Sequence, residues 1–252
     1  MSQVKPSAPP LFRRLGAELL GTCLLVTVVV GSGIAAESLS PSDVGLQLLE
    51  NSLATALGLG VLILVLGPVS GAHFNPLVSA TDWLLGRRRE TGLTGREAAA
   101  YGLAQLLGGV LGAMLANVMF DLPAGQISGT DRASAGRAVG EVVATAGLVL
   151  VIFALARTGR APLSAASVGA YIGSAYWFTS STSFANPAVT VGRIFSDTFA
   201  GISPTSVPLF LAAQVVGAAI GVMLVLTLFP DVRAAAGRAV TPHPATVPTE
   251  RS

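Results

Sequence analysis

The chain has 252 residues, of which 52% are hydrophobic and 11% are charged. An ordinary soluble domain carries about 25% charged residues, so this composition argues against a soluble globule. With one cysteine the chain cannot form a disulfide framework, and its two histidines lack the partners that a metal site or a His-based catalytic triad requires. We therefore expect neither enzyme activity nor a cofactor.

The few charges are spread unevenly and leave six stretches without Asp, Glu, Lys or Arg. These stretches are 19–36, 51–81, 98–120, 142–156, 161–192 and 198–230. A helix needs about 20 apolar residues to cross the hydrocarbon core of a bilayer. The fourth stretch is long enough only if Glu141 also lies inside the membrane, as Glu18 does in the first helix. The pattern predicts a multi-pass membrane protein.

The chain contains two similar halves. In the first half, G-A-E-L-L-G-T at 16–22 precedes F-N-P-L-V-S at 74–79 and L-A-Q-L-L-G-G-V-L-G-A-M at 103–114. The second half repeats these marks in the same order, as V-G-E-V-V-A-T at 139–145, A-N-P-A-V-T at 185–190 and A-A-Q-V-V-G-A-A-I-G-V-M at 212–223. Because each half crosses the membrane three times, the second half enters from the opposite side, and the repeats are inverted.

Two of the long uncharged stretches, 51–81 and 161–192, each hold an Asn-Pro pair near their far end. Asn is favoured just before a helix, and Pro is tolerated at the first helical position. We therefore predict two loops, G-P-V-S-G-A-H-F before Asn75 and T-S-S-T-S-F-A before Asn186, each followed by a re-entrant helix of about ten residues. Polar loops at membrane depth imply a pore, and the two facing helix N-termini repel cations at its centre.

The basic residues indicate the orientation. If six helices alternate, Arg132, Arg137 and Arg193 lie on one side. The other side carries Lys5, Arg13, Arg14, Arg87, Arg88, Arg89, Arg96, Arg157, Arg160, Arg233, Arg238 and Arg251. The positive-inside rule then places both termini in the cytoplasm. Because the basic residues form short groups between apolar stretches, we expect no nucleic-acid partner.

Inverted halves with paired Asn-Pro half-helices, and S-G-A-H-F-N-P at 70–76 in particular, resemble the major intrinsic proteins, which are the aquaporins and aquaglyceroporins. The resemblance covers about residues 11–230. It implies an all-α membrane protein with six transmembrane helices plus two re-entrant half-helices in two inverted repeats. The repeats would run over about 11–120 and 137–230 within a single channel domain, 1–252, whose flexible termini are 1–10 and 231–252.

The resemblance also assigns roles to pore residues. In the family the two Asn side chains donate to solutes in single file, a role that falls on Asn75 and Asn186. The full motifs are Asn75, Pro76 and Leu77, where the family usually has Ala last, and Asn186, Pro187 and Ala188. Glu18 and Glu141 would accept hydrogen bonds from the re-entrant loops, and proton transfer is the alternative. His73 would be a packed loop residue, with a pH gate as the alternative.

Fixed distances from the two Asn residues locate the outer constriction of the family, its selectivity filter. They assign this filter to Thr55, Ser174, Ser183 and Val189. Water-selective members have an aromatic residue, a His, a small residue and an Arg there, and glycerol channels keep the Arg. We therefore expect a wide, neutral filter with three hydroxyls and an isopropyl group. Arg193, one helical turn beyond Val189, either caps the half-helix or partly restores the lost charge.

The filter pattern, with Val189 at the position of the family Arg, resembles that of the aquaporin-like channels associated with bacterial arsenic resistance. The resemblance implies a passive channel for small neutral solutes, including metalloid hydroxides such as arsenite and antimonite, and also glycerol and water. It further implies a homotetramer that contacts membrane lipid, placed in the cell membrane, here a bacterial inner membrane. The alternatives are a water- or glycerol-selective channel without a metalloid role, an ion-coupled secondary transporter and a non-conducting scaffold.

Overall fold

The structure is a computed structural model that describes residues 9–87 and 91–229. Nearly all of the predicted flexible termini, 1–10 and 231–252, lies outside these ranges. So do six of the basic residues used for the orientation, namely Lys5, Arg88, Arg89, Arg233, Arg238 and Arg251.

The described residues form eight α-helices in the order predicted for two repeats. They are α1 (Leu11–Leu39), α2 (Val44–Ser70), α3 (Pro76–Gly86), α4 (Gly95–Met119), α5 (Ala135–Arg157), α6 (Ser164–Phe178), α7 (Pro187–Gly192) and α8 (Val207–Leu228). Short 3-10 turns, η1 (Ala161–Leu163) and η2 (Arg193–Phe195), precede α6 and follow α7. In each repeat, two helices come before a short half-helix and a further long helix follows it, which confirms the predicted all-α architecture.

Five of the described helices, α1, α2, α4, α5 and α8, are long and apolar enough to cross a membrane. The sixth crossing element is α6, which has only 15 residues. With the three residues of η1 before it, it extends over about 28 Å, close to the thickness of the hydrocarbon core. The short α3 and α7, with 11 and 6 residues, fall well below that length.

Two predicted boundaries are wrong in detail. The first loop was expected to include Gly67 and Pro68, but α2 continues through Pro68 to Ser70, so that only Gly71 to Phe74 precede Asn75. A proline inside a helix is tolerated in a packed membrane protein because neighbouring groups satisfy the backbone. The second half-helix, α7, is shorter than about ten residues because its last turn tightens into η2.

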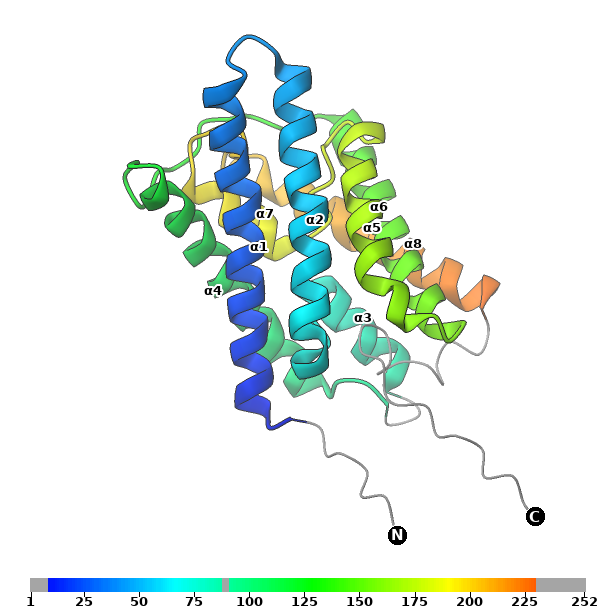
Figure 1. The fold of residues 1–252 in the computed structure, drawn as a ribbon. Helices are drawn as coiled ribbons and strands as arrows, with labels where there is room; N and C mark the ends of the chain where they lie inside the picture. Colours follow the sequence, from blue (N-terminus) through cyan, green and yellow to red (C-terminus); the bar gives the residue numbers. More distant parts are fainter. Residues whose placement is uncertain (1–8, 88–90, 230–252) are drawn as a thin grey trace, which may run out of the picture.

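The long helices pack closely through small residues in both repeats. A methyl group added at Gly112 of α4 would lie 2.2 Å from the carbonyl oxygen of Cys23 in α1. The equivalent Gly221 of α8 would bring a methyl group to 2.8 Å from the carbonyl oxygen of Ala146 in α5. Helix α4 thus packs on α1 and α8 on α5, while α2 and α6 join the repeats. Figure 1 shows α3 in the lower half of the molecule and α7 nearer its middle, behind α1 and α2.

A candidate pore between two half-helices

The two Asn-Pro pairs join the half-helices end to end. Each Asn side-chain oxygen caps the helix that follows it. Asn75 Oδ1 accepts a hydrogen bond from Leu77 N at 3.0 Å, and Asn186 Oδ1 accepts one from Ala188 N at 2.9 Å. Each amide nitrogen donates to the opposite loop. Asn75 Nδ2 lies 2.8 Å from the Ala185 carbonyl oxygen, and Asn186 Nδ2 lies 2.7 Å from that of Phe74. The two helix N-termini therefore face each other, as the inverted repeats predict.

Each re-entrant loop is held by a buried glutamate. Glu18 accepts hydrogen bonds from the backbone N–H groups of His73 at 3.0 Å and Phe74 at 2.7 Å. In the second repeat, Glu141 accepts from the N–H groups of Phe184 and Ala185, both at 2.8 Å. A glutamine on the last long helix of each repeat also donates to the carboxylate. Gln105 Nε2 lies 2.7 Å from Glu18 Oε2, and Gln214 Nε2 lies 2.6 Å from Glu141 Oε2. Both carboxylates thus replace water for loop groups at membrane depth.

Both loops adopt an unusual backbone at matching positions. Ala72 and Phe74, three and one residues before Asn75, have φ values of 49° and 49°. Ser183 and Ala185, at the same distances before Asn186, have φ values of 52° and 48°. A residue with a side chain pays about 1 to 2 kcal/mol for this left-handed conformation. The glutamate bonds stabilise it, and it turns the carbonyl groups of Phe74 and Ala185 toward the opposite Asn.

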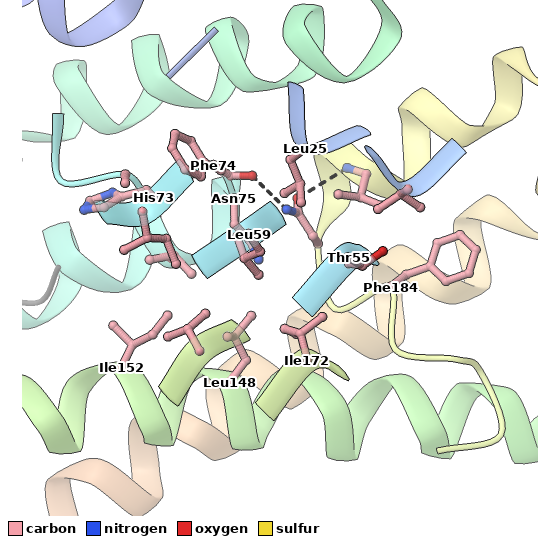
Figure 2. Close-up of a pocket in the computed structure, with 17 residues that line it drawn as sticks. Leu25, Thr55, Leu59, His73, Phe74, Asn75, Leu148, Ile152, Ile172 and Phe184 are labelled. Atoms are coloured by element: carbon pink, nitrogen blue, oxygen red, sulfur yellow. Dashed lines mark hydrogen bonds between the residues drawn. The ribbon is translucent and has the colours of Figure 1, made fainter. Parts of the chain in front are cut away.

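A narrow internal cavity of about 60 Å³ follows the line where the half-helices meet. Figure 2 shows His73 at one end of it and Thr55 and Phe184 toward the other, with Leu148, Ile152 and Ile172 across from Asn75. Its polar lining consists of Thr55, His73, Asn75 and Asn186, and the rest is aliphatic or aromatic. Among the described lining residues there is no Asp, Glu, Lys or Arg. The space suits a short file of about four water-sized groups.

The four filter positions counted from the Asn residues do not all meet. Thr55 and Val189 line the cavity. Ser183 is buried, and its hydroxyl has no hydrogen-bonding partner among the described residues, but it is not part of the lining. Ser174 is exposed, and its hydroxyl donates to the Tyr171 carbonyl oxygen at 2.7 Å. Ser174 is therefore not among the residues that line the cavity.

Helix α6 turns a different set of residues inward. Val168 and Ile172 line the cavity, while Tyr176 is buried and its hydroxyl lies 3.2 Å from Thr55 Oγ1. Ser174 lies on the other face of α6, away from the cavity, because α6 packs against both α2 and α5. Counting along the chain missed Tyr176. The four-residue spacing of Val168, Ile172 and Tyr176 was the signal that could have found it, since such residues share one helix face.

Leu77 and His73 have local packing partners. The Leu77 side chain packs against the hydrophobic core, and its neighbour Val78 lines the cavity instead. His73 lines the cavity, and its Nδ1 lies 3.1 Å from Ser79 Oγ. The ring of His73 meets that of Tyr101 edge-on at 5.5 Å. The extra bulk of Leu77 is therefore absorbed away from the pore.

Two arginines lie beside Phe184, toward the end of the cavity opposite His73. Arg193 is 3% exposed, and its guanidinium carbon lies 3.5 Å from the centre of the Phe184 ring. The guanidinium carbon of Arg132, in the connection between α4 and α5, lies 5.5 Å from the same ring. Burial lowers the pKa of Arg132 to about 10, with a further lowering from the charge of Arg137, so Arg132 stays protonated at neutral pH. Sequence reasoning assigned Arg132 only a topological role.

Comparisons with known proteins support the same architecture. The family model described as major intrinsic protein matches residues 5–184. The aquaglyceroporin AqpS of Rhizobium meliloti (strain 1021) is 47% identical over 223 residues, which cover 88% of this chain and 93% of that protein. The probable aquaporin AqpM of Archaeoglobus fulgidus is 29% identical over 238 residues, covering 82% of this chain and 93% of that protein.

A solved structure has a similar fold. The X-ray structure of the aquaglyceroporin from Plasmodium falciparum superposes with a TM-score of 0.66 at 22% sequence identity. The match covers 90% of this chain and 100% of that one. The arrangement of helices and half-helices is therefore one that an experimental structure also contains.

Proposed function

Because this chain belongs to the major intrinsic protein family and is a multi-pass membrane channel for small solutes such as glycerol and water, we propose that its solutes include the trivalent metalloid hydroxides arsenite and antimonite. As(OH)₃ is a neutral molecule about the size of glycerol at pH 7. The observation that carries the proposal is Val189, which stands at the filter position of the family Arg and lines the cavity.

The neutral lining favours an uncharged solute. A permeating ion needs groups that replace its hydration shell, and an ion-coupled transporter needs titratable groups facing its substrate. The carboxylates of Glu18 and Glu141 are instead occupied by loop N–H groups and a glutamine. These contacts support passive passage of a small neutral molecule over ion-coupled transport.

Val189 widens the outer end of the cavity and removes donors from it. An Arg side chain would bring five N–H donors in a fixed plane and a positive charge. Val189 brings an isopropyl group, and the polar group that α2 contributes to the lining is the hydroxyl of Thr55. A bulkier solute with several hydroxyls then meets less steric exclusion than it would beside an Arg.

Hydrogen-bond donors remain at the centre of the pore. An amide group carries two N–H donors, and the structure gives each amide nitrogen of Asn75 and Asn186 one acceptor among the described residues, across the loop junction. The second donor of each amide supports a role in guiding hydroxyl groups past the junction. A trihydroxy solute can accept there without leaving a buried donor unpaired.

Proteoliposome flux measurements test this proposal. We expect the native chain to carry arsenite, antimonite, glycerol and water faster than empty vesicles. In Val189→Arg, the larger solutes should be suppressed first, by about tenfold for arsenite, with water least affected, because the guanidinium narrows the outer end. Val189→Leu is the matched control, since it adds bulk without charge or donors and should reduce arsenite flux less.

Two outcomes would contradict the metalloid proposal. Arsenite and antimonite entry no faster than in empty vesicles, alongside normal glycerol or water flux, would leave a water- or glycerol-selective channel. Absence of flux for every solute would leave only a non-conducting role. We assign the chain no catalytic function, because the relatives are channels.

The remaining assignments rest on topology and on the family. The proposal places the protein in the cell membrane, a bacterial inner membrane, with both termini in the cytoplasm, as a homotetramer with one pore per subunit. Its single domain holds repeat one over about 11–120 and repeat two over about 137–230. Arg132, Arg137 and Arg193 then lie on the side away from the cytoplasm. Chemical cross-linking in native membranes tests the number of subunits.

A further inference from the structure

The two ends of the cavity are related by the inverted repeat but differ in charge. His73 and Phe184 are equivalent, each two residues before an Asn, and both line the cavity. Seven residues beyond each Asn, the first repeat has Asp82 and the second has Arg193. Both side chains are buried, at 2% and 3% exposure. The end away from the cytoplasm therefore has a buried positive charge where the cytoplasmic end has a carboxylate.

Arg193 is held against the pore wall. Its guanidinium packs on Phe184 at 3.5 Å from the ring centre, and its Nε donates to the carbonyl oxygen of Ala200. The Phe184 ring is fixed from behind by Phe210, which it meets edge-on at 5.0 Å. The guanidinium therefore contacts a residue of the cavity lining, Phe184, without lining the cavity itself.

Arg132 places a second positive charge beside the first. Its Nε donates to the Gly201 carbonyl oxygen at 2.6 Å and its Nη2 donates to that of Phe199 at 2.9 Å. Neutral carbonyl groups are thus the acceptors for both arginines. Within residues 9–87 and 91–229, the one ion pair joins Arg14 to Glu97. Among the described residues, no carboxylate forms an ion pair with Arg132 or Arg193, although the charge of Glu141 acts on Arg193 without direct contact.

Carboxylates do occur further out, at the rim. Glu37, Asp197 and Arg132 line an open hollow of about 400 Å³ at this mouth. Glu37 accepts from Phe199 N at 3.3 Å and Asp197 from Gly129 N at 2.9 Å. The carboxylates of this rim raise the local concentration of cations, and the positive charges of Arg132, in the hollow itself, and of Arg193 oppose their entry. Little water screens a buried charge, so its field reaches into the adjacent lumen.

Resting on the proposed channel function, we propose that Arg193 and Arg132, stacked around Phe184, form a cation barrier that replaces the Arg missing at Val189. The charge stands behind the wall instead of projecting into the lumen. The pore therefore keeps the width that Val189 provides for neutral solutes and still rejects cations. Arg132 and Arg193 would then determine charge selectivity from behind the pore wall, whereas the filter residues counted along the sequence are expected to line the pore.

The test compares charge with packing in one set of proteoliposomes. Potassium leak is measured with a voltage-sensitive dye, and glycerol and arsenite flux by stopped flow, for the native chain, Arg193→Gln, Arg132→Gln, the double Gln variant and the matching Lys variants. Gln keeps an N–H donor for the loop carbonyls without charge, while Lys keeps the charge. We expect the double Gln variant to leak potassium about tenfold faster, with glycerol flux changed less than about twofold, and the Lys variants to behave as the native chain.

Arg137→Gln is the matched control, because it removes one positive charge on the same side from a side chain that donates to Asp131 O and does not contact Phe184. It should not raise the leak. Equal leak in native and double Gln protein, or equal rises with Gln and Lys, would overturn the barrier. If the double variant loses glycerol flux through misfolding, Arg132→Gln decides, with a smaller rise expected and no rise overturning the proposal. Absence of glycerol and arsenite flux in the native chain would instead refute the channel function itself.

Discussion

At the scale of single residues, the pore depends on polar groups that are already committed to partners. The carboxylates of Glu18 and Glu141 hold the loops, and the side-chain oxygens of Asn75 and Asn186 cap the half-helices. What a solute can meet is the small remainder, namely unused amide donors, the Thr55 hydroxyl and His73. Small changes among the apolar residues of the lining therefore set its width.

Helix α6 provides a residue-scale test of which side chains form the lining. We expect Ile172→Phe to reduce arsenite and glycerol flux by about tenfold, because the larger ring fills a cavity only about 60 Å³ in volume. Ser174→Phe is the matched control and should leave both fluxes within about twofold of the native value, because Ser174 is exposed. Stopped-flow permeability checks both variants. A larger effect of Ser174→Phe than of Ile172→Phe would restore the filter position counted from Asn186.

At the scale of elements, the half-helix α7 is positioned by its contact with α4. A methyl group added at Gly192 would lie 2.4 Å from the carbonyl oxygen of Gly109, and one added at Gly109 would lie 2.4 Å from that of Ala188. The backbones of α4 and α7 thus meet without side chains between them. Since α7 follows directly from Asn186 and carries Val189, this contact determines where the pore residues stand.

Gly192→Ala tests that contact. The added methyl group cannot be accommodated unless α7 moves, so we expect the protein to lose about 1 to 3 kcal/mol of stability and most of its glycerol flux. Thermal unfolding in detergent and proteoliposome flux measure the two effects. Gly16→Ala serves as the control, because a methyl group there meets nothing within 4 Å. Native stability and flux in Gly192→Ala would show that α7 is not held by this close packing.

At the scale of the whole molecule, two inverted repeats meet to form one pathway. Neither half encloses the cavity alone, since its lining comes from both, with Asn75 and Val78 from one and Asn186 and Val189 from the other. The cross-loop bonds of the two Asn side chains tie the halves together at the centre. Rocking one repeat against the other, as alternating access requires, would break these bonds.

Passive conduction is the corresponding whole-molecule prediction. We expect glycerol and arsenite flux to rise linearly with the solute gradient and to be unchanged by a proton ionophore, because the lining that the described residues form contains no carboxylate for coupling. Stopped-flow traces with and without the ionophore, over a range of gradients, measure this. Accumulation against a solute gradient, abolished by the ionophore, would favour the ion-coupled transporter instead.

By itself, the sequence determined the features that depend on local chemistry. Apolar length predicted the crossing helices, Asn-Pro predicted the half-helix starts at Asn75 and Asn186, and the repeated motifs predicted inversion. These follow because helix length, capping and backbone satisfaction in lipid are decided within a few residues. Helix ends were less accurate, as with α2 passing through Pro68, because packing decides whether a weak turn continues.

Only the tertiary structure decided which side chains face the pore. The rotation of α6 is set by its contacts with α2 and α5, and it turns Ile172 and Tyr176 inward and Ser174 outward. The meeting of Arg132 and Arg193 at Phe184 joins segments 61 residues apart, from the α4–α5 connection and from η2. Such convergence depends on long-range packing, which no local spacing records.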